Sequence, residues 1–197
     1  TSGTVTENSA NFSNTITVVG SHTVAQRSIT PTASGVSKVY DGTTSMTGVT
    51  IGLTGKETSD IVTVSGLGAF SNKNVGTGLS YTLINLALSG ADSGNYYLSS
   101  GSSLSGSDGV ITTKNITAIT GVTAANKTYD GSTIASLNTS GAGFTGMVSG
   151  DTLTVATSTG AFSDKNVGTG KTVSITGLTL GGADASNYNL TVAGQSA

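Results

Sequence analysis

The feature that most constrains this 197-residue chain is an internal duplication. Three motifs recur in the same order, as KVYDGTT and KTYDGST, FSNKNVGTG and FSDKNVGTG, and GADSGNY and GADASNY, beginning at Lys38, Lys127, Phe70, Phe162, Gly90 and Gly182. The first pair is offset by 89 residues and the other two pairs by 92. Motifs that keep their order and nearly their spacing indicate a unit of roughly 90 residues written twice.

A unit of this length can form a small hydrophobic core of its own. We therefore predict a first module over residues 27–113 and a second module over residues 114–197. After its last shared motif the first copy continues through Gly109–Thr113, for which the second copy has no counterpart. The second module is therefore expected to lack its last strand.

Residues 1–26 match neither copy and are predicted to form a leading β segment. Two stretches of alternating residues, Thr15–Val19 and His22–Gln26, flank Gly20 and Ser21, which is typical of a hairpin. We expect this segment to be either the end of a preceding module or a hairpin that docks on the first module.

Composition and charge exclude several classes of function. Only 9% of the residues are charged and the formal net charge is −2, so the chain offers no basic surface for nucleic acid. No apolar run is long enough to cross a bilayer. His22 is the only histidine and cysteine is absent, which excludes a histidine-dependent nucleophilic centre in each module. We therefore expect that the chain is not an enzyme.

Hydrophobic periodicity predicts an all-β fold. Leu153 and Val155 alternate with threonine, and so do Val62 and Val64 in the first copy, as in strands with one buried face. No window of ten residues has helical periodicity. We predict two tandem modules, β-grasp-like or β-sandwich-like, with at most short helical turns, which we place at Ala91–Asn95 and Ala183–Asn187.

One strand of each copy changes the parity of its apolar positions. Tyr81 and Leu83 share one parity and Leu86 has the other, and the second copy repeats the change. A one-residue change turns side chains to the opposite face unless the backbone absorbs it. We therefore predict a β-bulge at Asn85 and at Gly177, because both residue types tolerate the backbone conformation that a bulge requires.

The Asp-Gly pairs invite two interpretations. Asp41-Gly42 and Asp130-Gly131 favour tight hairpin turns with positive φ. The matched aspartates are also calcium candidates, namely Asp41, Asp130, Asp92 and Asp184, with Asp60 or Asp151 as further ligands. Isolated aspartates in glycine-rich turns favour Asx-turns over metal binding, so we expect no cofactor and retain calcium as the alternative.

Two further motif residues have alternative uses. Lys38, Lys127, Lys73 and Lys165 lie near asparagines and could form Lys–Asn isopeptide bonds, whereas lysine beside a turn is usually solvated. Tyr96 and Tyr188 could stack on sugars, but the leucine two residues later favours core packing. The residues that we assign to structural motifs are Tyr40, Asp41, Gly42, Tyr129, Asp130, Gly131, Asn95, Tyr96, Asn187 and Tyr188.

These motifs resemble the YDG repeats, and the related mirror β-grasp repeats, of large bacterial surface adhesins of the filamentous-haemagglutinin type. The resemblance covers residues 27–190 and rests on three motifs in order, twice. It implies an extracellular, monomeric stalk or extender of the bacterial cell surface that serves adhesion or biofilm formation. Its partners would be neighbouring repeats, with host or matrix glycan or protein bound elsewhere in the parent protein. The alternatives are an adhesive module that itself recognises glycan or protein, and a self-cross-linking domain.

Overall fold

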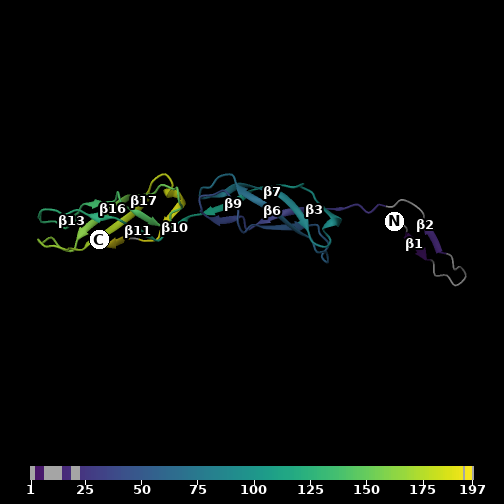
Figure 1. The fold of residues 1–197 in the computed structure, drawn as a ribbon, viewed down its shortest axis with the longest axis horizontal. Coiled ribbons are helices and arrows are strands. Elements are labelled where there is room, and N and C mark those ends of the chain that lie inside the picture. Colours follow the sequence, from purple (N-terminus) through teal and green to yellow (C-terminus); the bar gives the residue numbers. More distant parts are fainter. Residues whose placement is uncertain (1–2, 7–14, 19–22, 193, 197) are drawn as a thin grey trace.

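The computed structural model describes residues 3–6, 15–18, 23–192 and 194–196. The all-β prediction is confirmed, because the described residues form strands and only two single-turn 3-10 helices, η1 (Ser93–Asn95) and η2 (Ala185–Asn187). Both turns lie where the sequence predicts them. The two modules lie end to end along the long axis of the molecule (Figure 1). Neither of these short helices approaches the length and apolarity needed to cross a membrane.

The first module consists of two small sheets. The larger sheet has the strand order β4-β9-β7-β6 and the smaller sheet has the order β5-β3-β8. Strand β8 runs parallel to β3, and β4 runs parallel to β9. The strands are β3 (Arg27–Ser34), β4 (Ser37–Val39), β5 (Thr50–Thr54), β6 (Thr63–Phe70), β7 (Gly76–Ser89), β8 (Tyr96–Leu98) and β9 (Leu104–Thr112).

The second module repeats this arrangement with shorter strands. Its larger sheet has the order β13-β16-β17-β19, and its smaller pairings are β10 with β18, β11 with β15 and β12 with β14. The parallel pair β10 and β18 corresponds to β3 and β8. The strands are β10 (Lys114–Ile116), β11 (Ala118–Thr120), β12 (Thr123–Ala124), β13 (Ile134–Ala135), β14 (Leu137–Asn138), β15 (Gly143–Thr145), β16 (Thr154–Phe162), β17 (Val173–Gly181), β18 (Tyr188–Leu190) and β19 (Gly194–Ser196).

The predicted β-bulges are confirmed in both modules. Asn85 has φ 55° and Gly177 has φ 63°, and Asn85 is the only residue other than glycine with a positive φ among the described residues. The register of β7 against β6 shifts next to Asn85, and that of β17 against β16 shifts next to Gly177. The bulge returns Leu86 to the buried face that Leu83 already occupies.

Two of the predicted turns differ from the structure. Gly42 and Gly131 do have positive φ, but the strand that precedes each Asp-Gly pair does not form a hairpin with the strand that follows it. In the first module β4 pairs with β9 instead. The aspartate, not a strand ladder, closes the turn, because Asp41 accepts hydrogen bonds from the backbone N–H and the hydroxyl of Thr43.

The predicted leading hairpin is wrong in its strand partners. Strand β2 (Thr15–Val18) pairs with β1 (Gly3–Thr6), whereas Thr23–Gln26 forms no strand. Gln26 instead donates a side-chain hydrogen bond to the carbonyl of Gly94, so this stretch leads directly into the first module. The remainder of the predicted turn, residues 19–22, lies outside the described residues.

The second module holds only the beginning of a closing strand. β19 pairs antiparallel with β17 over Ser174–Thr176, as β9 pairs with β7 in the first module. The described part of β19 has three residues and β9 has nine. The start of the strand that we expected to be missing is therefore present.

The bulge at Gly177 gives the first testable prediction. Replacing Gly177 with valine forces a β-branched residue to a positive φ, and we expect the second module to lose about 1–3 kcal/mol of stability. Gly177→Asn should cost much less, because the first module carries asparagine at the matching position. Chemical denaturation of both variants measures the difference. Equal stability of the two variants would contradict the bulge assignment.

Candidate functional site: the junction between the modules

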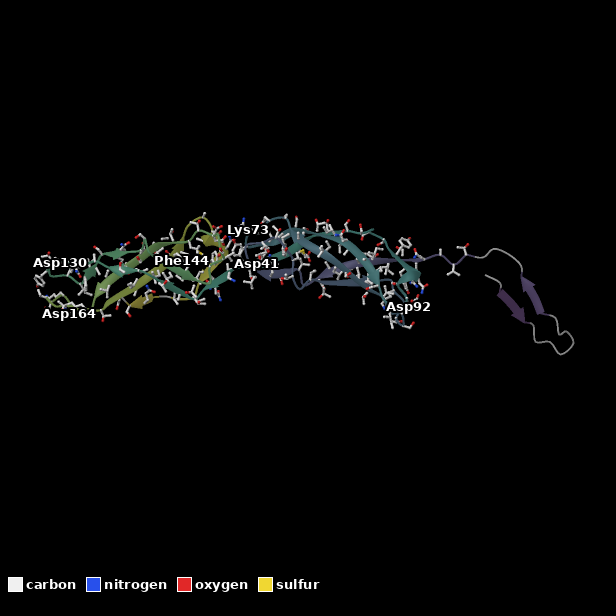
Figure 2. The ribbon with its side chains drawn as sticks, viewed as in Figure 1. Asp41, Lys73, Asp92, Asp130, Phe144 and Asp164 are labelled. Atoms are coloured by element: carbon white, nitrogen blue, oxygen red, sulfur yellow. The ribbon has the colours of Figure 1, made fainter. Side chains whose placement is uncertain are left out.

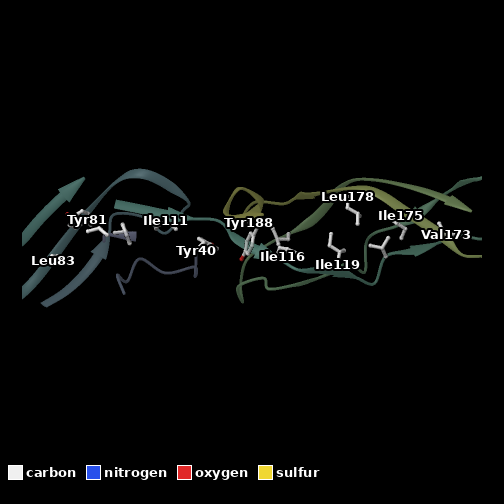
Figure 3. Packing of buried hydrophobic residues seen from close by; sticks show 14 of the residues in the cluster. Tyr40, Tyr81, Leu83, Ile111, Ile116, Ile119, Val173, Ile175, Leu178 and Tyr188 are labelled. Atoms are coloured by element: carbon white, nitrogen blue, oxygen red, sulfur yellow. The ribbon is translucent and has the colours of Figure 1, made fainter. Parts of the chain in front are cut away.

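The repeated motifs of the two modules meet at the junction. Tyr40, from the first YDG motif, is fully buried, and its ring packs edge-on against that of Tyr188, from the second GADASNY motif. The ring centroids lie 5.4 Å apart and the ring planes meet at 76°, which is a favourable aromatic geometry. Figure 3 shows the two rings joining the buried apolar residues of the first module to those of the second.

A buried carboxylate lies beside this aromatic pair. Asp151 accepts hydrogen bonds at Oδ2 from the hydroxyls of Tyr40, at 2.8 Å, and Tyr188, at 2.6 Å. Lys73 donates to Oδ1 at 3.4 Å. The Asp151 side chain is only 4% exposed, so these three donors replace water around the charge. Two of the three come from the first module.

The electrostatics of the cluster follow from these contacts. Burial by itself raises the pKa of Asp151, but the hydrogen bonds from Tyr188, Tyr40 and Lys73 together outweigh it and hold this pKa below its ordinary value. Burial, followed by the hydrogen bond to Asp151, raises the pKa of Tyr188 to about 12. The same two causes raise the pKa of Tyr40. The cluster is therefore most stable with an ionised carboxylate and two neutral phenols.

The KNVGTG loop of the first module makes a second contact across the junction. The backbone N–H of Val75 donates to Oδ1 of Asn187 at 3.0 Å, and Nδ2 of Asn187 donates to the side-chain oxygen of Asn74 at 3.3 Å. Asn187 is 2% exposed. A buried amide needs partners for both its donor and its acceptor, and the loop supplies one of each.

Close backbone packing forms the third contact. A Cβ atom placed on Gly42 would lie 2.8 Å from Cγ1 of Val148. At the matching glycine of the second module, Gly131, nothing lies within 4 Å. Glycine at position 42 therefore has a packing role in the junction in addition to its positive φ.

We call the surface formed by Tyr40–Gly42 and Lys73–Val75 the donor end, and the surface formed by Val148–Asp151, Asn187 and Tyr188 the acceptor end. Each module carries both ends. In the first module, Tyr96 donates to Asp60 at 2.6 Å and accepts from the backbone N–H of Glu57 at 3.2 Å. In the second, Tyr188 makes the matching contacts with Asp151 and Val148, at 2.6 and 2.9 Å. The acceptor end is thus a repeated structure that is built within one module.

The donor end of the second module faces away from the junction. Tyr129 is 58% exposed, in contrast to the fully buried Tyr40, and Val167 is 88% exposed. Its turn is nevertheless intact, because Lys127 donates to Asp130 at 2.8 Å as Lys38 donates to Asp41 at 2.7 Å. Figure 2 places Asp130 and Asp164 at the far end of the second module and Asp41 and Lys73 at the junction.

The structure does not assemble the calcium candidates into one site. Asp41 and Asp130 close the turns just described, and Asp92 and Asp184 accept the backbone N–H of Ile61 and Thr152, each at 2.8 Å. Over the described residues, no three His, Cys, Asp or Glu side chains lie close enough together to hold a metal ion. These carboxylates therefore act as turn and loop acceptors.

The lysine candidates for isopeptide bonds have other partners. Lys38 is 4% exposed and donates to Asp41 and to the carbonyls of Thr43 and Ser45. Lys73 faces Asp151. Within the part of the chain that the structure describes, no hydrogen bond joins these lysines to an asparagine side chain.

Sequence reasoning did not identify the junction residues as one site. It singled out Tyr40 and Tyr188 within separate modules and weighed Asp151 and Lys73 for calcium and isopeptide chemistry. The available signal was the matched pair Asp60 and Asp151, since an aspartate kept at the same place in both copies is consistent with a shared partner such as the motif tyrosine.

Comparison with known proteins gives one match. The family described as the YDG domain matches residues 23–103 and again residues 112–197. No curated protein and no solved structure matches the chain.

The two motif glycines permit a matched test of the junction. Gly42→Ala and Gly131→Ala introduce the same strain, because the two residues have φ 79° and 77°. Only the first brings a Cβ against Val148. We expect both variants to lose about 1–3 kcal/mol in their own module, and only Gly42→Ala to change the distance between probes on the two modules. The junction assignment fails if Gly131→Ala changes that distance equally.

The pKa shifts predict a pH window for the junction. The folded pKa of Asp151 lies below its ordinary 3.8, so its contribution is complete above about pH 4 and is lost as the pH falls through the lower folded value. The folded pKa of Tyr188 is about 12 against an ordinary 10, so its contribution is complete below pH 10 and is lost as the pH rises through 12. Inter-module distance measured against pH should be constant between these limits. Asp151→Asn should remove only the acid transition.

Proposed function

The chain belongs to the YDG domain family, of which it holds two copies, and we propose that the pair is an extender of a bacterial cell-surface or secreted adhesin. In this role the modules space or display a binding region for adhesion or biofilm formation and have no catalytic activity. The observation that carries the proposal is the junction, in which the donor end of one module docks on the acceptor end of the next through buried polar contacts.

Such a junction suits an array because its two halves differ. A contact between unlike surfaces on identical units is heterologous, and it propagates in one direction unless it closes into a ring. Modules stacked in this way contact only their neighbours and form an elongated molecule. The first module carries its own acceptor end at Asp60 and Tyr96, so the same contact can be made with a preceding module.

The chemistry of the junction also suits an extracellular role without disulfides. The chain has no cysteine, so no covalent bond restrains one module relative to the next. Buried hydrogen bonds to a charged acceptor contribute about 1.5–3 kcal/mol each, which is enough for a few of them to hold an orientation. We therefore propose that the hydrogen-bonded junction supplies the stiffness that disulfides supply in other secreted proteins.

The absence of cysteine makes the spacer role directly measurable. Thr58→Cys and Thr169→Cys place single labels on exposed residues of the two modules. Each module should span roughly 30–40 Å, so we expect a chain extended to roughly 60–90 Å and a single narrow distance between the labels. Tyr40→Phe combined with Asp151→Asn removes the hydroxyl and carboxylate contacts and should broaden that distribution.

Binding measurements separate the spacer from the alternative, an adhesive module. The unlabelled chain should show no saturable binding on glycan or host-protein arrays. A broad distance distribution in the parent chain would contradict the spacer role. Saturable glycan binding that is lost on changing exposed Tyr129 would assign the chain to recognition instead.

A further inference from the structure

A cavity of about 920 Å³ opens at the far end of the second module. It lies between two irregular stretches, residues 123–129 and 164–171, and its floor includes the apolar side chains of Phe162 and Val173. Neither the junction nor the spacer role uses this cavity.

The first module has no comparable opening because β9 occupies the matching place. The second half of β9 runs parallel to β4, with Ile111 opposite Lys38, and antiparallel to β7, with Ile111 opposite Gly76. The counterparts of Lys38 and Gly76 in the repeat are Lys127 and Gly168, and both line the cavity. The cavity is therefore the position of one missing strand segment.

The backbone on both sides of the cavity lacks its ladder partner. Residues 125–133 form no strand, although their counterparts include β4. Strand β17 begins at Val173, whereas β7 begins at Gly76, the counterpart of Gly168. Both differences follow from the absence of a central strand, because each neighbouring edge then has N–H and C=O groups without partners.

The side chains around the cavity match those that β9 covers. Phe70 is 4% exposed beneath β9, and a Cβ on Gly109 would lie 2.6 Å from its ring. Phe162, its counterpart, is only half-buried. The Lys127 ammonium lies 5.7 Å from the Phe162 ring centroid, as that of Lys38 lies 5.9 Å from that of Phe70, so the floor keeps the same construction.

Strand β19 shows the direction of entry. Gly194 lies opposite Thr176 and Ser196 lies opposite Ser174, so the strand advances along β17 toward Val173 at the rim of the cavity. A segment that continued in this direction would lie between residues 126–128 and 168–172, as β9 lies between β4 and β7.

We propose that this cavity is a strand-acceptor groove that binds an extended polypeptide segment with the pattern of Gly109–Thr112, a small residue followed by two apolar residues and threonine. Main-chain hydrogen bonds to both edges would provide affinity, and the isoleucine position would fill the space above Phe162. The inference rests on the duplication and on the cavity, and does not depend on the spacer role.

The test adds the chain's own strand to the groove. In the alignment of β9 with β19, Ala197 matches Gly106, so residues 107–113 (SDGVITT) are fused after Ala197, and the peptide of residues 106–113 is also added in trans. We expect the fusion to raise the melting temperature of the second module by about 4–8 °C or more. Amide exchange at Lys127, Thr128 and residues 168–172 should slow roughly tenfold.

Matched controls keep the inference falsifiable. Ile111→Asp within the added segment should abolish both effects, because it places a charge over Phe162. The free peptide, followed by chemical-shift changes at the same amides, tests the groove even if the fusion perturbs folding. Equal melting temperatures for the fusion and its aspartate version would overturn the inference. A sugar that protected these amides when the peptide did not would assign the cavity to a glycan.

Discussion

The junction depends on the buried charge of Asp151. A carboxylate that is 4% exposed must receive its hydrogen bonds from protein, and it receives them from Tyr40, Lys73 and Tyr188. Because two of these donors belong to the other module, any rotation or slip of one module on the other leaves the charge without partners. Apolar packing of the Tyr40 and Tyr188 rings alone would tolerate such a slip. We infer that the carboxylate contributes orientation more than stability.

Local features of the fold could be predicted from the sequence. The bulges at Asn85 and Gly177 followed from a change of parity, which reports directly on which face a side chain must occupy. The two 3-10 turns followed from short-range side-chain chemistry in the same way. The hairpins at the Asp-Gly pairs could not be predicted correctly, because Gly42 signals only a positive φ, and the partner of β4 is β9, which lies about 70 residues away.

The junction was beyond prediction for a related physical reason. A side chain such as Asp151 has the same local sequence whether it binds calcium, closes a turn or accepts hydrogen bonds from another module. Duplication narrows these choices only when the two copies are compared in space. Tyr40 and Tyr129 share the motif but not the environment, since one is fully buried and the other is 58% exposed. The sequence states what each module can contact, and the neighbouring structure decides which contact forms.

The two ends of the second module are linked by the same strand position. In the first module Tyr40 follows β4, which β9 holds in the sheet, and the backbone N–H of Tyr40 donates to the carbonyl of Thr112 at the end of β9. The donor end is therefore positioned by the closing strand. Tyr129 lacks that support in the described residues, because the matching place is the cavity. Completion of a module by its last strand and docking of its donor end are thus successive steps, and an ordered donor end requires a completed module.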